Sequence, residues 1–224
     1  MADKTTTAHK LYEIALLISR LVLMNLLWIA FVALGLVVAG IVPATVSVVG
    51  VFRAYERDGD GFSWLALAWR LYVDALRRFW FLSVAFSAAM VSLLLSSWVL
   101  DFQQSVFGLF PGLLMVYLGA LALPYFAANE ASFEMGRLAL VTNALRLPLA
   151  WGLTSLTILL AEAAVAALCF FVPGLIPLVG VSIPLFLACS ILTKRWNRAL
   201  RELGQPELRV AREPLFGEPP SAPR

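Results

Sequence analysis

Residues 21–52 form a stretch of 32 residues without a single ionisable side chain. As one helix the stretch would be about 48 Å long, far more than the roughly 30 Å hydrocarbon core of a bilayer. Gly40 and Pro43 interrupt it, and proline is well accommodated in the first turn of a new helix. The sequence therefore predicts three pieces: a first span from Ile14 to Ala39, a turn at Gly40–Val42, and a short helix from Pro43 to about Arg57.

The rest of the chain is as apolar as this stretch. Of its 224 residues, 61% are hydrophobic and 14% are charged, whereas soluble domains carry about 25% charged residues. Such a chain needs lipid as a solvent for its surface. The predicted fold is an all-α polytopic membrane helix bundle in one domain, residues 1–203. It has five full transmembrane helices, the later four at Phe79–Leu100, Val106–Ala128, Leu147–Val172 and Leu175–Thr193.

The positive charges predict the orientation of these spans. All but three of the 17 Lys and Arg residues lie in the loops 43–78 and 129–146 or after the last span. Because Lys and Arg collect in cytoplasmic loops, these loops and the C-terminus are expected to be cytoplasmic. With five crossings the N-terminus lies outside. If the Pro43 helix is a sixth crossing, the N-terminus also lies inside. We favour the second alternative, although the helix is short.

Two cytoplasmic segments have the composition of interfacial amphipathic helices. In residues 62–80 the side chains of Arg70, Asp74 and Arg78 recur every four residues among Trp and Tyr, which predicts a polar stripe with i,i+4 pairs. The second segment, residues 129–148, carries Glu130, Gly136 and Arg137. We interpret these six residues as a candidate docking surface for a partner. From residue 204 to 224 the chain is rich in Pro and charge, which predicts a disordered cytoplasmic tail.

Three polar residues fall inside predicted spans. Glu162 is the most informative, because a charged side chain at the bilayer centre costs about 2.5–3.5 kcal/mol on insertion scales. It is either a proton- or substrate-binding carboxyl or a structural hydrogen-bonding group between helices. Arg20 either extends to the interface or pairs with Glu162. Asn25 is more typical of a hydrogen bond between helices than of a ligand contact.

The sequence offers little for catalysis. Cys169 and Cys189 lie in apolar runs and are interpreted as buried free thiols, and His9 is the single histidine. No nucleophile elbow, phosphate-binding loop or zinc motif occurs. We therefore expect no enzymatic activity, no metal and no cofactor. No basic run interleaved with aromatic residues is present either, so nucleic acid is not an expected partner despite the net charge of +3.

Two resemblances to known families complement this picture. The segment Glu130-Ala131-Ser132, with Gly136 and then Leu147-Pro148, resembles the cytoplasmic coupling loop of ABC importer permeases, with Ser132 in place of an alanine and a spacing off by one. Asn25-Leu26-Leu27-Trp28, followed by Gly35 and Pro43-Ala44-Thr45, is similar to the N-terminal signature of YesL-like bacterial membrane proteins. That family is named for a domain of unknown function, and the similarity covers roughly residues 10 to 195.

The second resemblance implies a multi-pass protein of the bacterial plasma membrane, encoded near carbohydrate importers and glycan-degrading enzymes. Our leading hypothesis is a non-enzymatic accessory or regulatory component associated with carbohydrate uptake. Its partners would be the lipid bilayer and other membrane proteins such as ABC importer subunits. The alternative is a small secondary transporter with Glu162 in the substrate or proton path. The sequence leaves the substrate, the partner and the oligomeric state open.

Overall fold

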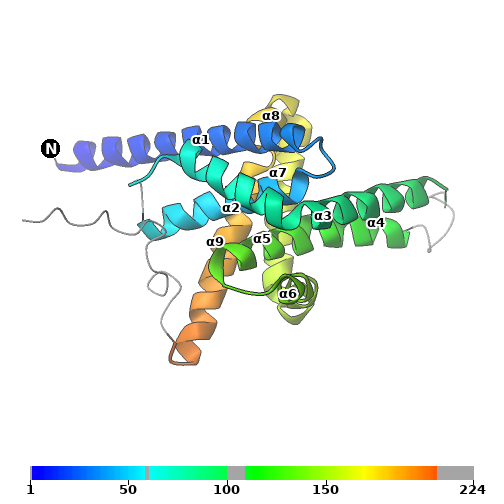
Figure 1. Cartoon of the computed structure of the whole chain (residues 1–224). Coiled ribbons are helices and arrows are strands. Elements are labelled where there is room, and N and C mark those ends of the chain that lie inside the picture. Colours follow the sequence, from blue (N-terminus) through cyan, green and yellow to red (C-terminus); the bar gives the residue numbers. More distant parts are fainter. Residues whose placement is uncertain (1, 59–60, 100–108, 206–224) are drawn as a thin grey trace, which may run out of the picture.

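The computed structural model describes residues 2–58, 61–99 and 109–205, with the backbone alone for residues 2–11 and 13. Helices and turns make up this part of the chain, which confirms the predicted all-α helical membrane bundle (Figure 1). Its elements are α1 (Ala2–Leu34), α2 (Ile41–Asp58), α3 (Trp64–Val99), α4 (Leu109–Val116), η2 (Tyr117–Ala122), α5 (Leu123–Ser132), α6 (Arg137–Ala150), α7 (Gly152–Phe171), η3 (Pro173–Leu175), α8 (Ile176–Val179) and α9 (Ser182–Glu202).

The long uncharged stretch is divided, as predicted, but the turn comes earlier. α1 ends at Leu34, and α2 begins at Ile41, two residues before Pro43. Gly40 therefore closes the turn instead of opening it. Glycine is needed there because an added Cβ would lie 2.7 Å from the Val32 carbonyl oxygen. The backbone reverses at Leu36 and Val37, whose φ angles of 53° and 64° are left-handed and unfavourable for residues other than glycine.

α2 is the central helix of the bundle. Eleven of its residues between Val42 and Ala54 are buried, and they lie on all sides of the helix. α3, α5, α1 and α9 surround it. A helix that is apolar all round belongs in the core of a bundle. The short helix that the sequence predicted as an addition to the first span is thus the element around which the others pack.

α3 corrects a second prediction. The expected interfacial helix over residues 62–80 and the expected span Phe79–Leu100 form one continuous helix from Trp64 to Val99, because neither Gly nor Pro interrupts this segment. Its first half packs on α2 at the buried Ala68, whose carbonyl accepts a hydrogen bond from Ser47, and on α1 through the buried Tyr72. It is therefore part of the bundle core and not a separate surface helix.

The third predicted span ends later than expected and the fourth begins later, while the predicted start of the third at Val106 lies outside the described residues. α4, η2 and α5 together form an apolar helix over Leu109–Ser132, with a π-helical stretch in the middle. α6 then continues through Pro148 to Ala150, so the next span begins at Gly152 and not at Leu147. The backbone turns at Trp151, which packs against Trp196 with a centroid distance of 6.3 Å.

The fifth predicted span, Leu175–Thr193, is broken. Its first part, η3 and α8, and its second part, α9, meet at an angle of 56° around Gly180 and Val181. Pro184 contributes to the break, because it has no N–H to donate to the Gly180 carbonyl. The described residues therefore hold four helices with the length and composition of a membrane span, and one pair bent at a break.

Pairs of neighbouring residues give the direction of each helix. Trp28 donates a hydrogen bond to Thr45 while Arg20 lies near Tyr55, so α1 and α2 are antiparallel. Phe31 stacks on Tyr72 at 4.4 Å, and α3 runs parallel to α1. As a result, α2 ends and α3 begins at the end of the bundle marked by Arg20. α9 approaches this end of the bundle, which we call the basic end, because Ser190 and Thr193 bond to Glu56 and Arg53 of α2.

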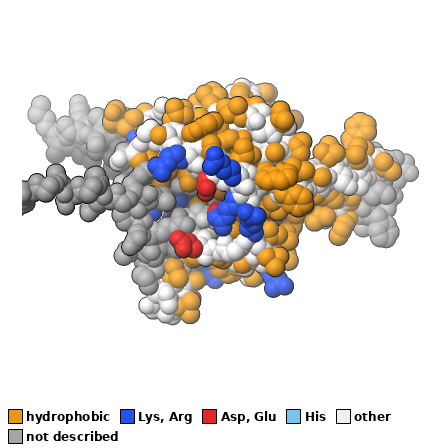
Figure 2. Space-filling view, in the orientation of Figure 1, with side chains coloured by type: hydrophobic (Ala, Val, Ile, Leu, Met, Phe, Trp, Pro, Cys, Tyr) orange, Lys and Arg blue, Asp and Glu red, His pale blue; other side chains and the backbone are white. Residues whose placement is uncertain are grey.

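α3 and α4 extend beyond the other helices. The turn after α1 is fixed to α3 because Ser83 and Ser87 both donate hydrogen bonds to the Val38 carbonyl, at 3.0 and 2.9 Å. α3 continues from there to Val99, a further distance of about 18 Å at 1.5 Å per residue. Figures 1 and 2 show this projecting hairpin on the right, covered with hydrophobic side chains, while the charged side chains in view gather over the middle of the molecule.

Candidate functional site

Asn25 is fully buried on α1 and is bonded to the break between α8 and α9. Its Nδ2 donates to the Pro177 carbonyl at 2.8 Å and to the Ile176 carbonyl at 3.3 Å. Its Oδ1 accepts from the N–H groups of Val181 and Ser182, at 2.8 and 3.0 Å. In a straight helix Val181 would donate to Pro177. The carboxamide therefore replaces a hydrogen bond that the break removes, and holds the bent helix against α1.

The other two predicted intramembrane residues lie elsewhere. Arg20 places its guanidinium over the rings of Tyr55 and Trp64, 5.5 and 5.2 Å from their centroids, so it is held by aromatic side chains of α2 and α3. Glu162 is half-buried on α7. It follows Ser155 and Ile158 at helical spacing and precedes Cys169, and these three residues are buried, so Glu162 lies on the inward face of its helix.

A polar network joins α2 to α9 near the basic end. Arg53 pairs with Glu56 at 2.9 Å and donates to the Thr193 hydroxyl at 2.6 Å. Glu56 also accepts hydrogen bonds from Ser190 and Thr193, at 2.8 and 3.0 Å. This network was not predicted from the sequence, although the three-residue spacing of Arg53 and Glu56 on one helix is a recognisable signal.

The last turn of α2 carries a second ion pair. Arg57 donates from Nε and Nη2 to Asp58, at 2.8 and 2.5 Å. These hydrogen bonds hold the pKa of the Asp58 carboxyl below its usual value, and they raise the pKa of Arg57. The pair is more exposed than the Arg53–Glu56 pair, since 41% of the Asp58 side chain is accessible.

Arg78 and Glu130, both predicted docking residues, form an ion pair across the helices α3 and α5 at 2.6 Å. Arg78 also donates to the Met135 carbonyl at 3.2 Å. It is therefore directed at α5 and at the following turn, and not only along its own helix as the i,i+4 pattern predicted. These two contacts fix the turn 133–136 between α5 and α6.

The other predicted docking residues are exposed. Arg70 and Asp74 lie on the outer side of α3. Gly136 precedes α6 in an extended conformation, with φ −66° and ψ 153°, and Arg137 is the first residue of that helix. The structure thus brings Arg78, Glu130, Gly136 and Arg137 together at the α5–α6 turn. The predicted tail 204–224 lies outside the described residues, except for its first two positions.

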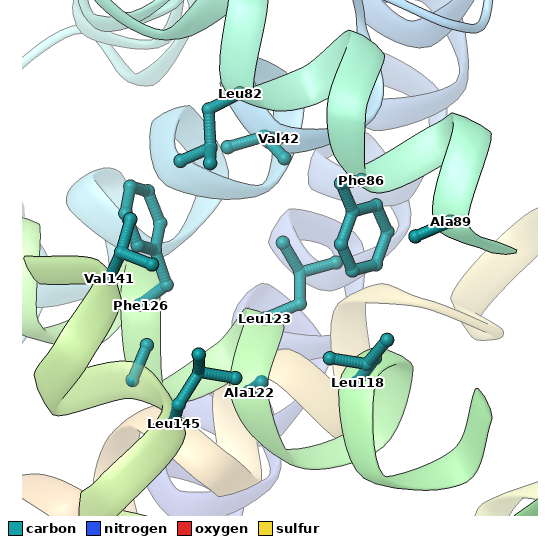
Figure 3. A pocket seen from close by; sticks show the side chains of 11 residues that line it. Val42, Leu82, Phe86, Ala89, Leu118, Ala122, Leu123, Phe126, Val141 and Leu145 are labelled. Carbon is teal, nitrogen blue, oxygen red and sulfur yellow. The ribbon is translucent and has the colours of Figure 1, made fainter. Parts of the chain in front are cut away.

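An apolar cavity of about 180 Å³ lies beside this turn. Figure 3 shows its wall side chains, with Leu123 directed into the middle. The wall contains no charged or hydrogen-bonding side chain. Its residues are Val42 from α2, Leu82, Phe86 and Ala89 from α3, Leu118 and Ala122 from η2, Leu123 and Phe126 from α5, and Val141, Ala144 and Leu145 from α6.

The π-helical stretch η2 forms one side of this cavity. Such stretches are rare and are often found at functional sites. The Tyr117 hydroxyl at its start donates to the Leu145 carbonyl of α6. This contact joins two walls of the cavity. In the part of the chain that the structure describes, no three His, Cys, Asp or Glu side chains come close enough to hold a metal ion.

Part of the chain matches a known protein family. Residues 21–101 match the family described as "Protein of unknown function, DUF624". This region covers the second part of α1 from Leu21 onward, the turn after it, and all of α2 and α3. Neither the curated proteins nor the solved structures contain a match to this chain. The matched part is the packing centre of the bundle, and the α5–α6 turn lies outside it.

Proposed function

We propose that this chain is a non-enzymatic membrane protein that serves as an accessory component of carbohydrate uptake, and that it binds its partner at the α5–α6 turn. The observation that supports this proposal is the fixed position of the turn. Arg78 pairs with Glu130 and donates a hydrogen bond to the Met135 carbonyl, and these contacts fix the backbone of the turn. Gly136 and Arg137 therefore have a defined position. A surface ordered before binding loses less conformational entropy when a partner docks.

The position of the turn in the fold also supports the proposal. It follows an apolar helix long enough to span a bilayer and precedes a shorter helix, α6, with another span after it. The Leu138 side chain on the first turn of α6 is 79% exposed, so it is accessible to a partner that docks at the turn. The link to carbohydrate uptake rests on the similarity to YesL-like proteins and on the resemblance of residues 130–148 to a permease coupling loop.

Photo-crosslinking from α6 tests the proposal. A photoreactive residue at position 138 is compared with one at position 149, because Leu138 and Leu149 are equally exposed on the same helix, at 79% and 74%. We expect a protein adduct from position 138 and not from position 149, in native membranes of sugar-fed cells. An adduct with an importer ATPase would support the uptake role. Identical adducts from both positions, or no protein adduct, would contradict the docking surface.

One observation favours a second candidate, a small secondary transporter. The helix pair α8–α9 is discontinuous, and transporters of this class commonly bind substrate or ions at such breaks. Glu162 lies on the inward face of α7, which packs against α9. If Glu162 carries a proton or a substrate, Glu162→Gln should abolish flux in reconstituted vesicles. Glu134→Gln, at an exposed position outside the spans, is the control and should leave flux unchanged.

A further inference from the structure

We infer that the cavity beside η2 is a binding site for one phospholipid of the bilayer, with an acyl chain in the cavity and an anionic headgroup at Arg137. The inference does not rest on the proposed function, but it uses Arg137, which also belongs to the partner surface proposed there. Its first support is the lining of the cavity. An apolar cavity of about 150 Å³ stays dry and accepts small hydrocarbons, and this one has about 180 Å³ with apolar walls throughout.

The second support is the location of the cavity. Leu82, Phe86 and Ala89 belong to the apolar half of α3, and Leu118 to Phe126 belong to the next apolar span. These wall segments lie where a membrane supplies hydrocarbon and not water. Several wall residues remain accessible, among them Leu145 at 40%, so the cavity opens to the outside of the bundle. A lipid chain can therefore enter from the side.

The third support is the charge at one end of the cavity. On three of the helices that line the cavity, a charged residue lies one helical turn away from a wall residue. Arg78 precedes Leu82 by four residues, Glu130 follows Phe126 by four, and Arg137 precedes Val141 by four. Residues four apart lie on the same face of a helix, so all three charged residues lie at the same end of the cavity.

The positive charge at the start of α6 favours an anion there, with the exposed Glu134 three residues earlier as the opposing charge. Arg78 and Glu130 neutralise each other in their ion pair, and Arg137 adds a positive charge at an exposed position. The first turn of α6 has no side-chain cap and no acidic residue, so its backbone N–H groups are also available near Arg137. A phosphate group at this position would complement both features.

Lipid retention measured by native mass spectrometry tests the inference. The full chain is purified from nanodiscs that contain equal amounts of phosphatidylglycerol and phosphatidylcholine. We expect one retained phospholipid per chain, with a preference for phosphatidylglycerol of about fivefold, the factor that one basic residue near a membrane surface contributes. Absence of a retained lipid would overturn the site.

Two pairs of variants test where the acyl chain and the headgroup of the lipid bind. Ala89→Phe fills the cavity and should remove the lipid, whereas Ala88→Phe, at an exposed neighbouring position, should not. Arg137→Gln should remove the preference for phosphatidylglycerol. Arg146→Gln, on the opposite side of α6, should keep it. Equal lipid retention in both alanine variants would overturn the cavity as the binding site, and an unchanged preference in Arg137→Gln would overturn the headgroup position.

A phospholipid with a photoreactive acyl chain gives a measurement that does not depend on variants. Its adducts in the wild-type protein should concentrate on Leu82, Phe86 and Leu145. Leu94 and Leu95, which are exposed on the projecting part of α3, should be labelled less often. Uniform labelling of all these positions would show that the acyl chain contacts the lipid-facing surface in general, and would overturn the inference.

Discussion

Asn25 on the first apolar helix accepts a hydrogen bond from the backbone N–H of Val181, at 2.8 Å, more than 150 residues further along the chain. Replacing Asn25 with Leu leaves the N–H groups of Val181 and Ser182 and the Pro177 carbonyl without this partner. Each buried polar group left unsatisfied costs about 1–3 kcal/mol, so we expect a marked decrease in the free energy of unfolding. An SDS titration in mixed micelles measures it.

The same substitution at Asn143 is the control for this prediction. Asn143 is half-buried and contacts the Met135 sulfur at 3.3 Å, a weak hydrogen bond. We expect Asn143→Leu to change the free energy of unfolding much less than Asn25→Leu. Equal effects of the two substitutions would mean that Asn25 does not stabilise the break.

The ion pair of Arg78 should determine the order of the α5–α6 turn. In Arg78→Gln the pair with Glu130 and the bond to the Met135 carbonyl are both lost or weakened. We expect faster amide hydrogen exchange in residues 133–136 and at the start of α6, with little change elsewhere. Arg77→Gln, at the neighbouring exposed position, should exchange like the wild type. If Arg78→Gln exchanges like the wild type as well, the turn is fixed by other contacts.

The network on α2 should contribute more than the ion pair at its end. Glu56→Gln removes the negative charge beside Arg53, whose side chain is only 12% exposed. Hydrogen bonds to charged groups are worth about 1.5–3 kcal/mol, and we expect a decrease in the free energy of unfolding within this range. Asp58→Asn, the same chemical change at an exposed pair, should cost at most about 1 kcal/mol. A larger decrease in the free energy of unfolding for Asp58→Asn than for Glu56→Gln would contradict a stabilising role of the buried network.

The turn between α1 and α2 should be strained at Val37. A left-handed conformation costs about 1–2 kcal/mol for a residue with a Cβ, and glycine removes this cost. Glycine also loses more backbone entropy on folding, which destabilises the folded state by about 0.5–1 kcal/mol. Val37→Gly should therefore raise the free energy of unfolding by about 0.5–1 kcal/mol, the difference of these two contributions. Val38→Gly, where φ is not left-handed, should lower it. Destabilisation by both substitutions would mean that the turn is not strained.

The sequence was sufficient to predict the class of the fold and the approximate position of each apolar helix. Charge-free runs of about 20 residues are long-range signals that do not depend on tertiary contacts. The break in the last span also had a local signal, since Pro177, Gly180 and Pro184 all lie within it, yet we predicted one continuous span. Length and hydropathy outweighed the helix-breaking residues in that prediction.

The remaining errors concern partners that are distant in sequence. The polar stripe of Arg70, Asp74 and Arg78 predicted a surface helix, but the opposite side of the same helix packs on α2, which no local pattern indicates. Asn25 was correctly interpreted as a hydrogen-bonding residue, but its partners are backbone groups of a helix that was predicted to be continuous. Those groups become available only when that helix is broken.

Where the axis of α3 lies along the bilayer normal, the unequal reach of the helices gives the protein a wedge shape across the bilayer. The hairpin of α3 and α4 extends about 18 Å beyond the turn after α1, so at that depth it displaces less lipid than the whole bundle does at the basic end. Lipids on the two sides of the membrane must therefore fill different areas around one molecule. A protein of this shape is accommodated with least packing stress where the membrane bends toward the narrow side, which makes membrane curvature a variable in its distribution.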